Sequence, residues 1–273
     1  MAESSRSTPA PLIRALDLSR GVLRERPAGL LTDFDGTLSP IVADPGSARL
    51  AHGAADALRA LVDRLAVVAV VTGRAPLDAR RMTGVPGLLV AGNHGTEWVE
   101  PGAETPVTSP DAVRVRHLLA SVLDRVPGIE GVTVEDKGIS ATVHYRNVAD
   151  PDGARDAVLR AIGGMPEGLE LRRGRMSLEL RPVGLGDKGA ATRAIIERHG
   201  LRGVVVMGDD ITDLDMFTAV DDLREAGRLH GVIIGVGGAD AEVPPEVVRA
   251  ADIVLPDVGN AAQFLQVLAA EIV

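Results

Sequence analysis

Two aspartates stand at the end of an apolar run near the N-terminus. The segment LLTDFDGTL places Asp33 and Asp35 directly after residues typical of a buried strand, and Gly36 permits a turn behind them. A carboxylate in this position is unfavourable unless a cation or hydrogen-bond donors compensate its charge. One carboxylate can act as a nucleophile while its neighbour acts as acid and base. The pair therefore indicates a cationic partner and nucleophilic or acid-base chemistry.

A second acidic cluster follows another apolar run. The segment RGVVVMGDDITD ends in Asp209, Asp210 and Asp213. Taken alone, GDDITD is more typical of a solvated strand-to-helix turn or a helix cap. Carboxylate oxygens are, however, the ligands that Mg²⁺ prefers, and a Mg²⁺ ion with few protein ligands is normally completed by phosphate and water. Together, the two acidic clusters predict a Mg²⁺ site and phosphoryl chemistry.

Polar residues also follow two further apolar runs. Thr72 follows LAVVAVV, and Asn93, His94 and Gly95 follow GLLVAG. As single residues, Thr72 is typical of a helix cap, and a His or a Lys such as Lys188 is ordinarily structural or at the surface. Ligands of open α/β sheets bind beyond the carboxyl ends of the strands, so we expect these groups to converge on one crevice. Thr72 and Lys188 are then suitable donors to phosphate oxygens.

The elements that must position these residues follow from the alternation of apolar and amphipathic segments. The expected strands are GLLTDFD, LAVVAVVTGR, GLLVAGNHG, RGVVVMGDD, GVIIGV and ADIVLP, with helices over residues 50–65 and 188–199. Residues 11–25 are expected to form a short helix behind a loose tail. Its apolar residues are Leu12, Ile13, Leu16 and Leu23. The alternation predicts an α/β fold with a doubly wound parallel sheet.

The segment between residues 107 and 181 follows a different pattern. The stretches VTVEDKGISATVHYR and LELRRGRMSLELRP alternate with period two around a Lys-Gly and an Arg-Gly turn, and a helical segment precedes each. Two helix-plus-hairpin units predict a smaller α+β module inserted into the larger domain. The expected organisation is a tail and short helix over residues 1–28, a core over residues 29–106 and 182–273, and the inserted module over residues 107–181.

The composition argues against several classes of protein. The formal net charge of -9 at pH 7 disfavours a broad basic face for nucleic acid or anionic lipid. The absence of cysteine excludes disulfides and thiolate metal sites. The opening residues do not resemble a signal peptide, and no apolar run reaches the roughly 18 residues of a membrane span. We expect a monomeric, cytoplasmic protein that acts on a small molecule and binds neither nucleic acid nor membrane.

In order along the chain, DFDGTL, a Thr-Gly strand end, Lys188 and GDDITD resemble the four motifs of the haloacid dehalogenase phosphatase superfamily. The segments DFDGTLSPIVADP, VVTGR, AGNHGTE, KGISATVHYR, LELRPVGLGDKG and GDDITDLDMF are similar to those of trehalose-6-phosphate phosphatases. One departure is Leu214, where that family usually has Glu, and it concerns a local contact beside the aspartates. The resemblance implies a Mg²⁺-dependent phosphatase that acts on trehalose 6-phosphate and carries an inserted cap.

The resemblance also implies roles for the matching residues. Asp33 would attack the phosphorus and become an aspartyl phosphate. Asp35 would protonate the leaving sugar oxygen and then activate the hydrolytic water. The Asp33 carboxylate, the Asp35 backbone carbonyl and Asp209 would hold Mg²⁺, with Asp213 close by or acting through water. Thr72 and Lys188 would hold phosphate oxygens.

By the same resemblance, the inserted module would be a mobile cap that binds the sugar. The cap residues implied in this role are Glu135, Lys137, Arg146 and Glu179. The core side of the pocket would be supplied by Asn93, His94 and Gly95. Without the resemblance, charged residues on a hairpin face are more often a solvated sheet face.

Three other functions stay open at this level. Sucrose-phosphate and mannosylglycerate-phosphate phosphatases share this fold class, so the sugar can differ. A non-catalytic sugar-phosphate sensor has no need of a nucleophile beside an acid, and the Asp33 and Asp35 pair argues against it. A phosphomutase would retain the phosphoryl group instead of releasing inorganic phosphate.

Overall fold

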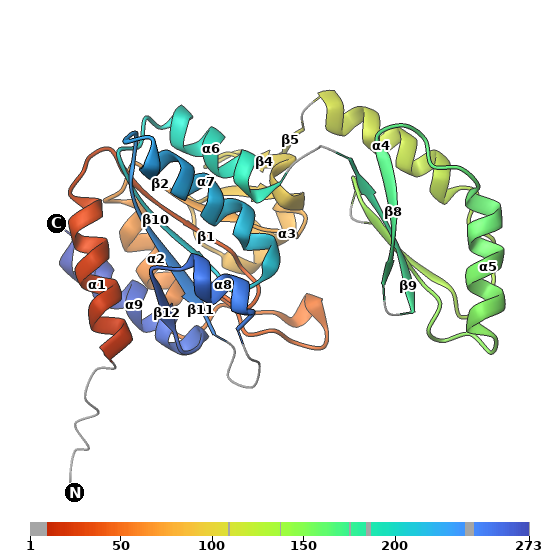
Figure 1. Ribbon diagram of the computed structural model, residues 1–273, viewed down its shortest axis with the longest axis horizontal. Helices are drawn as coiled ribbons and strands as arrows, with labels where there is room; N and C mark the ends of the chain where they lie inside the picture. The colour runs from red at the N-terminus through yellow and green to blue at the C-terminus, as the bar shows by residue number, and fades with distance from the viewer. Residues whose placement is uncertain are drawn as a thin grey trace, which may run out of the picture. The chain divides into compact units, whose positions relative to one another are not determined.

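The computed structural model describes residues 10–108, 110–136, 138–174, 176–183, 187–237 and 243–272. The chain divides into two compact units (Figure 1). The larger unit contains residues 1–106 and 187–273, and the smaller unit contains residues 107–186. The larger unit carries both acidic clusters.

The larger unit is built on a sheet with the strand order β12-β11-β10-β1-β2-β3-β4. The parallel strands are β1 (Ala28–Thr32), β2 (Val67–Val71), β3 (Leu89–Gly92), β10 (Gly203–Gly208), β11 (His230–Val236) and β12 (Ile253–Leu255). Strand β1 pairs with β10 on one side and β2 on the other, and all its residues are buried. This burial on both faces explains why its sequence is a continuous apolar run and not an alternating one.

All the predicted parallel strands form, and the doubly wound fold is confirmed. The strands β4 (Glu97–Val99) and β5 (Val107–Thr108) were not predicted. Strand β4 runs antiparallel to β3. Both strands are too short for a periodic pattern to identify them.

Helices cover both faces of this sheet (Figure 1). One apolar layer includes Leu58 and Phe264, and the other includes Ile195 and Phe217. The first layer belongs to α1 (Ala10–Leu23), α2 (Ala54–Val62) and α9 (Val258–Glu271). The second belongs to α6 (Lys188–Arg198), α7 (Leu214–Glu225) and α8 (Pro245–Ala250). The remaining helix of this unit, α3 (Pro76–Thr83), packs against β3 and β4.

Helix α1 confirms the predicted N-terminal helix, and its apolar residues do not all face the sheet. Leu12, Leu16 and Leu23 are buried against the sheet, whereas Ile13 is 49% exposed. The buried positions recur at helical spacing and share one face, and Ile13 is rotated about 100° away from Leu12. The helix contacts β10, β11, β12 and α9, so it forms part of the core of the larger unit.

The smaller unit is a four-stranded antiparallel sheet with the order β6-β7-β9-β8. Its hairpins are β6 (Thr133–Asp136) with β7 (Ala141–His144), and β8 (Leu169–Gly174) with β9 (Ser177–Pro182). The helices α4 (Pro110–Leu123) and α5 (Pro151–Ile162) cover one face, where Val143 and Leu178 are buried. Each helix precedes one hairpin, so both predicted helix-plus-hairpin units are confirmed.

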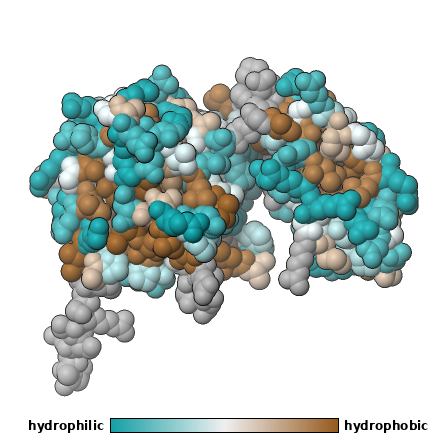
Figure 2. All heavy atoms as spheres, viewed as in Figure 1, coloured by the Kyte–Doolittle hydropathy of each residue, from teal (hydrophilic) through white to brown (hydrophobic). Residues whose placement is uncertain are grey.

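The surface of each unit mixes polar and apolar side chains (Figure 2). Exposed large apolar residues lie in loops and beside strands, such as Ile41 and Val183, and on helices, such as Leu77 and Val248. Scattered apolar residues of this kind are ordinary on a globular surface. Among the described residues, no helix is long and apolar enough to cross a membrane.

The packing of α1 can be tested with two neighbouring substitutions. Leu12→Ala should lower the free energy of unfolding by about 2–5 kcal/mol, because it opens a cavity under the helix. Ile13→Ala should change it by less than about 0.5 kcal/mol, because the side chain is half exposed. Urea denaturation of both variants measures the difference. Equal losses would mean that α1 does not pack as described.

Candidate active site

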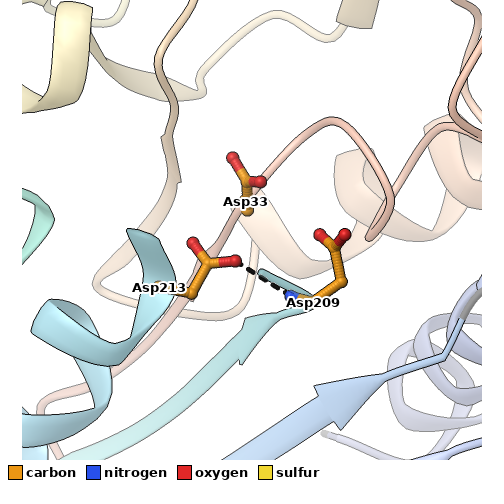
Figure 3. Close-up of side chains that lie close together, drawn as sticks. All are labelled: Asp33, Asp209 and Asp213. Atoms are coloured by element: carbon orange, nitrogen blue, oxygen red, sulfur yellow. Dashed lines mark hydrogen bonds between the residues drawn. The ribbon is translucent and has the colours of Figure 1, made fainter. Parts of the chain in front are cut away.

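Three aspartates meet at the carboxyl edge of the parallel sheet (Figure 3). Asp33 follows β1, Asp209 follows the neighbouring β10, and Asp213 ends the short 3-10 helix η3 (Ile211–Asp213). One carboxylate oxygen from each lies within 4.8 Å of the others. Asp33 is 6% exposed and Asp213 is fully buried. The sheet therefore brings together carboxylates that lie far apart in the sequence.

Lys188 lies between two of these aspartates. Its Nζ is 3.0 Å from Asp33 Oδ1 and 2.6 Å from Asp213 Oδ1, and its side chain is 2% exposed. Lys188 is the first residue of α6, and Asp187 caps this helix by accepting a hydrogen bond from the Ala190 N–H. The cap fixes where the helix begins and hence where the ammonium group enters the aspartate cluster.

The burial of these charges shifts their pKa values. Burial is the largest cause that raises the pKa of Asp33, and the charges of Asp213 and Asp209 add to it while Lys188 opposes it. Burial and then Asp213 raise the pKa of Asp209 to about 7. Burial alone would lower the pKa of Lys188, but Asp33 and Asp213 raise it far above its ordinary value. Negative charge is therefore in excess within the cluster.

The donor set of this cluster suits a divalent cation. Three carboxylates and one ammonium group leave two excess negative charges when all are ionised. Hard oxygen ligands of this kind suit Mg²⁺. Both Asp213 oxygens already accept hydrogen bonds, Oδ1 from Lys188 and Oδ2 from the backbone N–H groups of Asp209 and Asp210. This leaves Asp33 and Asp209 as the better metal ligands, with Asp213 holding the surrounding groups in place.

The turn behind Asp33 approaches Asp209 closely. Gly36 has a φ of 79°, and a Cβ at this position would lie 1.9 Å from Asp209 Oδ2. Only glycine fits both the left-handed backbone and the close approach. The next residue, Thr37, donates its hydroxyl hydrogen bond to Asp209 Oδ1 at 2.8 Å. Sequence reasoning missed Thr37, although its position next to the turn glycine could have suggested a contact with the second acidic cluster.

Asp35 lies outside the three-aspartate cluster and pairs with Arg74. Arg74 donates from Nε to Asp35 Oδ2 and from Nη2 to Asp35 Oδ1, both at 2.6 Å. The guanidinium also lies 5.3 Å from the centre of the Phe34 ring and donates to the Pro45 carbonyl at 2.8 Å. This two-point contact engages both Asp35 oxygens. Sequence reasoning placed Arg74 at the strand end that carries Thr72 but gave it no partner, because only the fold reveals its contact with Asp35.

Thr72 and the Asn93–Gly95 segment lie next to each other. The Thr72 hydroxyl accepts a hydrogen bond from the Arg74 N–H at 3.2 Å, as in a helix-capping turn, and the residue is 1% exposed. The backbone N–H of His94 donates to the Thr72 carbonyl at 2.9 Å, and that of Asn93 donates to the Arg74 carbonyl at 2.8 Å. These hydrogen bonds join the ends of β2 and β3, which we predicted to lie at one edge of the sheet.

The predicted sugar-binding residues of the smaller unit lie on and beside its sheet. Glu135, Thr142 and Glu179 pair across β6, β7 and β9, and Arg172 continues the row on β8. Directly paired residues share a sheet face, and this face is opposite the buried Val143 and Leu178. Glu135 Oε2 lies 3.3 Å from His144 Nε2. Of the other two predicted sugar-binding residues, Arg146 is exposed in the turn after β7, and Lys137 lies outside the described residues.

Leu214, where the sequence departs from the resembling family, begins α7. Its side chain is partly buried and packs against the apolar layer that contains Phe217. The contacts of the neighbouring Asp213 with Lys188 and with the backbone N–H groups of Asp209 and Asp210 are all present. Leu214 thus adds apolar packing behind the aspartate cluster without displacing Asp213.

The fold resembles solved structures of trehalose-6-phosphate phosphatases. The C-terminal domain of trehalose-6-phosphate phosphatase from C. albicans matches with a TM-score of 0.67 at 20% sequence identity, covering 98% of this chain and 100% of that one. At this identity the match concerns the fold alone. The family model described as Trehalose-phosphatase matches residues 31–239. The chain belongs to the trehalose-phosphatase family.

Two relatives match at higher sequence identity. A trehalose-phosphate phosphatase of Mycobacterium avium is 38% identical over 259 residues, which cover 91% of this chain and 63% of that protein. A protein of Mycobacterium tuberculosis described as an uncharacterized glycosyl hydrolase is 42% identical over 215 residues, which cover 74% of this chain but 16% of that protein. The chain therefore spans less than two thirds of the length of these relatives.

The charge excess in the aspartate cluster predicts a pH-dependent response to metal. The folded-state pKa values of Asp33 and Asp209 lie above the ordinary value of 3.8, so the metal-free folded protein binds more protons than the unfolded chain. The contribution of Asp33 and Asp209 to the free energy of unfolding should therefore be greatest below about pH 4. It should fall as the pH rises toward about 7 to 8. A divalent cation such as Mg²⁺ prefers ionised carboxylates, so excess Mg²⁺ should restore this stability.

The measurement is the melting temperature with excess Mg²⁺ and with EDTA, at about pH 5 and about pH 8. The gain from Mg²⁺ should be larger at the higher pH, and Asp209→Asn should reduce it. Asp56→Asn is the control, because Asp56 is exposed on α2 and pairs with Arg59, which is not part of the cluster. An equal gain at both pH values would contradict the link between metal binding and these carboxylates.

Proposed function

We propose that this protein is a Mg²⁺-dependent phosphatase that hydrolyses trehalose 6-phosphate to trehalose and phosphate through an aspartyl phosphate. The proposal is based on the buried contact of Lys188 with Asp33 and Asp213, which lie beside Asp209. Membership of the trehalose-phosphatase family supports the choice of substrate. The proposal includes Mg²⁺ as the metal and a monomer that acts on a small sugar phosphate.

Asp33 is the proposed nucleophile. Its backbone N–H donates to the Met207 carbonyl at 2.9 Å, which fixes the residue between β1 and β10. One Asp33 oxygen contacts Lys188, whose positive charge favours the ionised form that can attack phosphorus. The carboxylate oxygen forms a bond to phosphorus as the bond from phosphorus to the sugar oxygen breaks. Burial weakens the competition of water for these charges.

Asp35 is the proposed acid and base. It would give a proton to the leaving sugar oxygen and take one from the water that hydrolyses the aspartyl phosphate. Both Asp35 oxygens now accept hydrogen bonds from Arg74. To protonate the leaving oxygen, Asp35 must therefore exchange at least one of these hydrogen bonds for a contact with the substrate.

Lys188 and Thr72 are the proposed donors to phosphate oxygens. The Lys188 ammonium has three N–H donors, and its contacts with Asp33 and Asp213 leave one for a phosphate oxygen. The Thr72 hydroxyl accepts from Arg74 N–H and keeps its own hydrogen for donation. A Mg²⁺ ion held by Asp33, the Asp35 carbonyl and Asp209 would offset the negative charge of the phosphate and the carboxylates.

For the sugar, we propose binding by residues of the smaller unit, with Asn93, His94 and Gly95 contributing from the larger unit. The proposed smaller-unit residues are Glu135, Lys137, Arg146 and Glu179. Two of them, Glu135 and Glu179, lie in one row on the polar face of the sheet. Carboxylates in such a row can accept hydrogen bonds from several sugar hydroxyls at once.

The test is phosphate release from trehalose 6-phosphate, sucrose 6-phosphate, glucose 6-phosphate and p-nitrophenyl phosphate, each with Mg²⁺ and with EDTA. Trehalose 6-phosphate should be preferred, and EDTA should abolish turnover. Asp33→Asn should fold normally and lose roughly 10³-fold or more in kcat, because it removes the nucleophile. A different preferred sugar phosphate would overturn the substrate assignment. Retained turnover in Asp33→Asn would overturn the mechanism, and no turnover of any ester would favour a sensor.

The sugar site is tested by comparing substrates with and without a disaccharide. Glu135→Ala and Glu179→Ala should each lower kcat/KM for trehalose 6-phosphate by about 10- to 100-fold, because each removes hydrogen bonds to the sugar. Turnover of p-nitrophenyl phosphate should change by less than about threefold, because it carries no sugar. Glu130→Ala is the matched control, since Glu130 is exposed in the loop before β6. Equal losses on both substrates would contradict a sugar-binding role.

A further inference from the structure

One buried carboxylate of the larger unit has no part in the proposed chemistry. Glu97 begins β4 and is 4% exposed. Asn93 donates a hydrogen bond from Nδ2 to Glu97 Oε2. Burying a carboxylate is unfavourable unless its hydrogen bonds are made in the fold. Ordinary packing alone therefore does not explain why a carboxylate is buried beside Asn93.

The segment that Glu97 holds has an unusual backbone. Asn93, His94 and Gly95 form the 3-10 helix η2 and have successive φ values of 49°, 56° and 93°. Residues other than glycine rarely adopt positive φ, so side-chain contacts must hold this loop in place. Thr96 supplies one by donating its hydroxyl to the Asn93 carbonyl at 2.9 Å, and Trp98 supplies another from its indole N–H to the Gly95 carbonyl at 2.7 Å.

This loop contacts both elements that carry the proposed phosphate donors. On one side, the N–H groups of Asn93 and His94 donate to the carbonyls of Arg74 and Thr72. On the other side, a Cβ at Gly95 would lie 2.5 Å from the Cβ of Ala191, in the first turn of α6. That helix begins with Lys188. A shift of the loop would therefore move Thr72 and Lys188 relative to each other.

The chemistry of Glu97 also determines how the Asn93 amide is oriented. Glu97 Oε2 accepts the hydrogen bond from Asn93 Nδ2, so the amide nitrogen faces Glu97. The amide oxygen then points away, and Asn93 Oδ1 is buried without a hydrogen-bond partner among the described residues. Glu97 thus fixes one defined arrangement of the loop.

We propose that Glu97 is a positioning residue for phosphate binding. Through Asn93 it holds the Asn93–Gly95 loop between the turn of Thr72 and the first turn of α6, and so keeps Thr72 and Lys188 at the separation that a phosphate group needs. This inference rests on the proposed function in one respect, the assignment of Thr72 and Lys188 as phosphate donors. Glu97 itself touches neither substrate nor metal in this role.

The test uses two variants of Glu97 that differ in hydrogen bonding but not in size. Glu97→Gln retains an acceptor oxygen for Asn93, and Glu97→Met fills a similar volume without one. Replacing a buried charge by an apolar side chain of similar size is often tolerated by the fold. If Glu97→Met does not fold, Asn93→Ala removes the same hydrogen bond from the loop side and takes its place. Glu104→Ala is the control, because Glu104 is exposed seven residues further along.

The measurements are KM and kcat for p-nitrophenyl phosphate, the inhibition constant of inorganic phosphate, the melting temperature, and acrylamide quenching of tryptophan fluorescence. Trp98 is the single tryptophan of the chain and contacts Gly95, so its fluorescence reports on the loop. Glu97→Met should raise both KM and the phosphate inhibition constant by about tenfold, because the donors are misplaced. Glu97→Gln should stay within about threefold of the unsubstituted protein.

The outcomes separate positioning from a purely structural role. A lower melting temperature in Glu97→Met with unchanged KM, unchanged phosphate inhibition and unchanged Trp98 quenching would overturn the inference. If the unsubstituted protein hydrolyses no phosphate ester, the proposed function fails, and Trp98 quenching then decides the positioning of the loop. Increased quenching in Glu97→Met, restored in Glu97→Gln, would support it, and equal quenching in both would overturn it.

Discussion

The contact of the buried Lys188 ammonium with Asp33 and Asp213 is the interaction on which the site depends. Each of these groups would be strongly unfavourable alone in an apolar interior, and removing one partner would leave the others uncompensated. The contact joins the end of β1, the start of α6 and the turn after β10, which are distant in the sequence. The position of every other residue in the site is defined relative to these three elements.

The parallel sheet makes this arrangement possible. Strand β1 lies between β10 and β2, so the residues that follow these strands emerge at the same edge. The strands themselves are apolar and fully buried, and the polar residues appear only where the strands end. The cost of bringing like charges together is met by the burial of apolar surface in the two layers around the sheet. The same edge suits a divalent cation, because the carboxylates outnumber the single ammonium group.

Close backbone approaches bring the remaining parts of the site into contact. At Gly36 the turn behind Asp33 approaches the Asp209 carboxylate, and at Gly95 the Asn93–Gly95 loop approaches α6. A side chain at either position would separate elements that must touch. These approaches, together with the Thr37 hydrogen bond to Asp209, link the two acidic clusters and the loop into one connected region.

The sequence by itself determined the α/β class, the parallel strands, the two hairpins and the convergence of Asp33, Asp209 and Asp213. Each depends on a local pattern, and the convergence depends also on the rule that parallel strands end at one edge. Lys188 begins a helix and follows no strand, so its place beside Asp33 was expected only from the family resemblance. The tertiary structure alone decided which side chains pair. The partners Asp35 with Arg74, and Thr37 with Asp209, are separated by 39 and 172 residues. Such pairs depend on strand register and loop conformation, which local periodicity does not encode. For the same reason, the hydrogen bond from Asn93 to Glu97 was not predicted, because the loop that carries Asn93 has positive φ angles that the residue types permit but do not require.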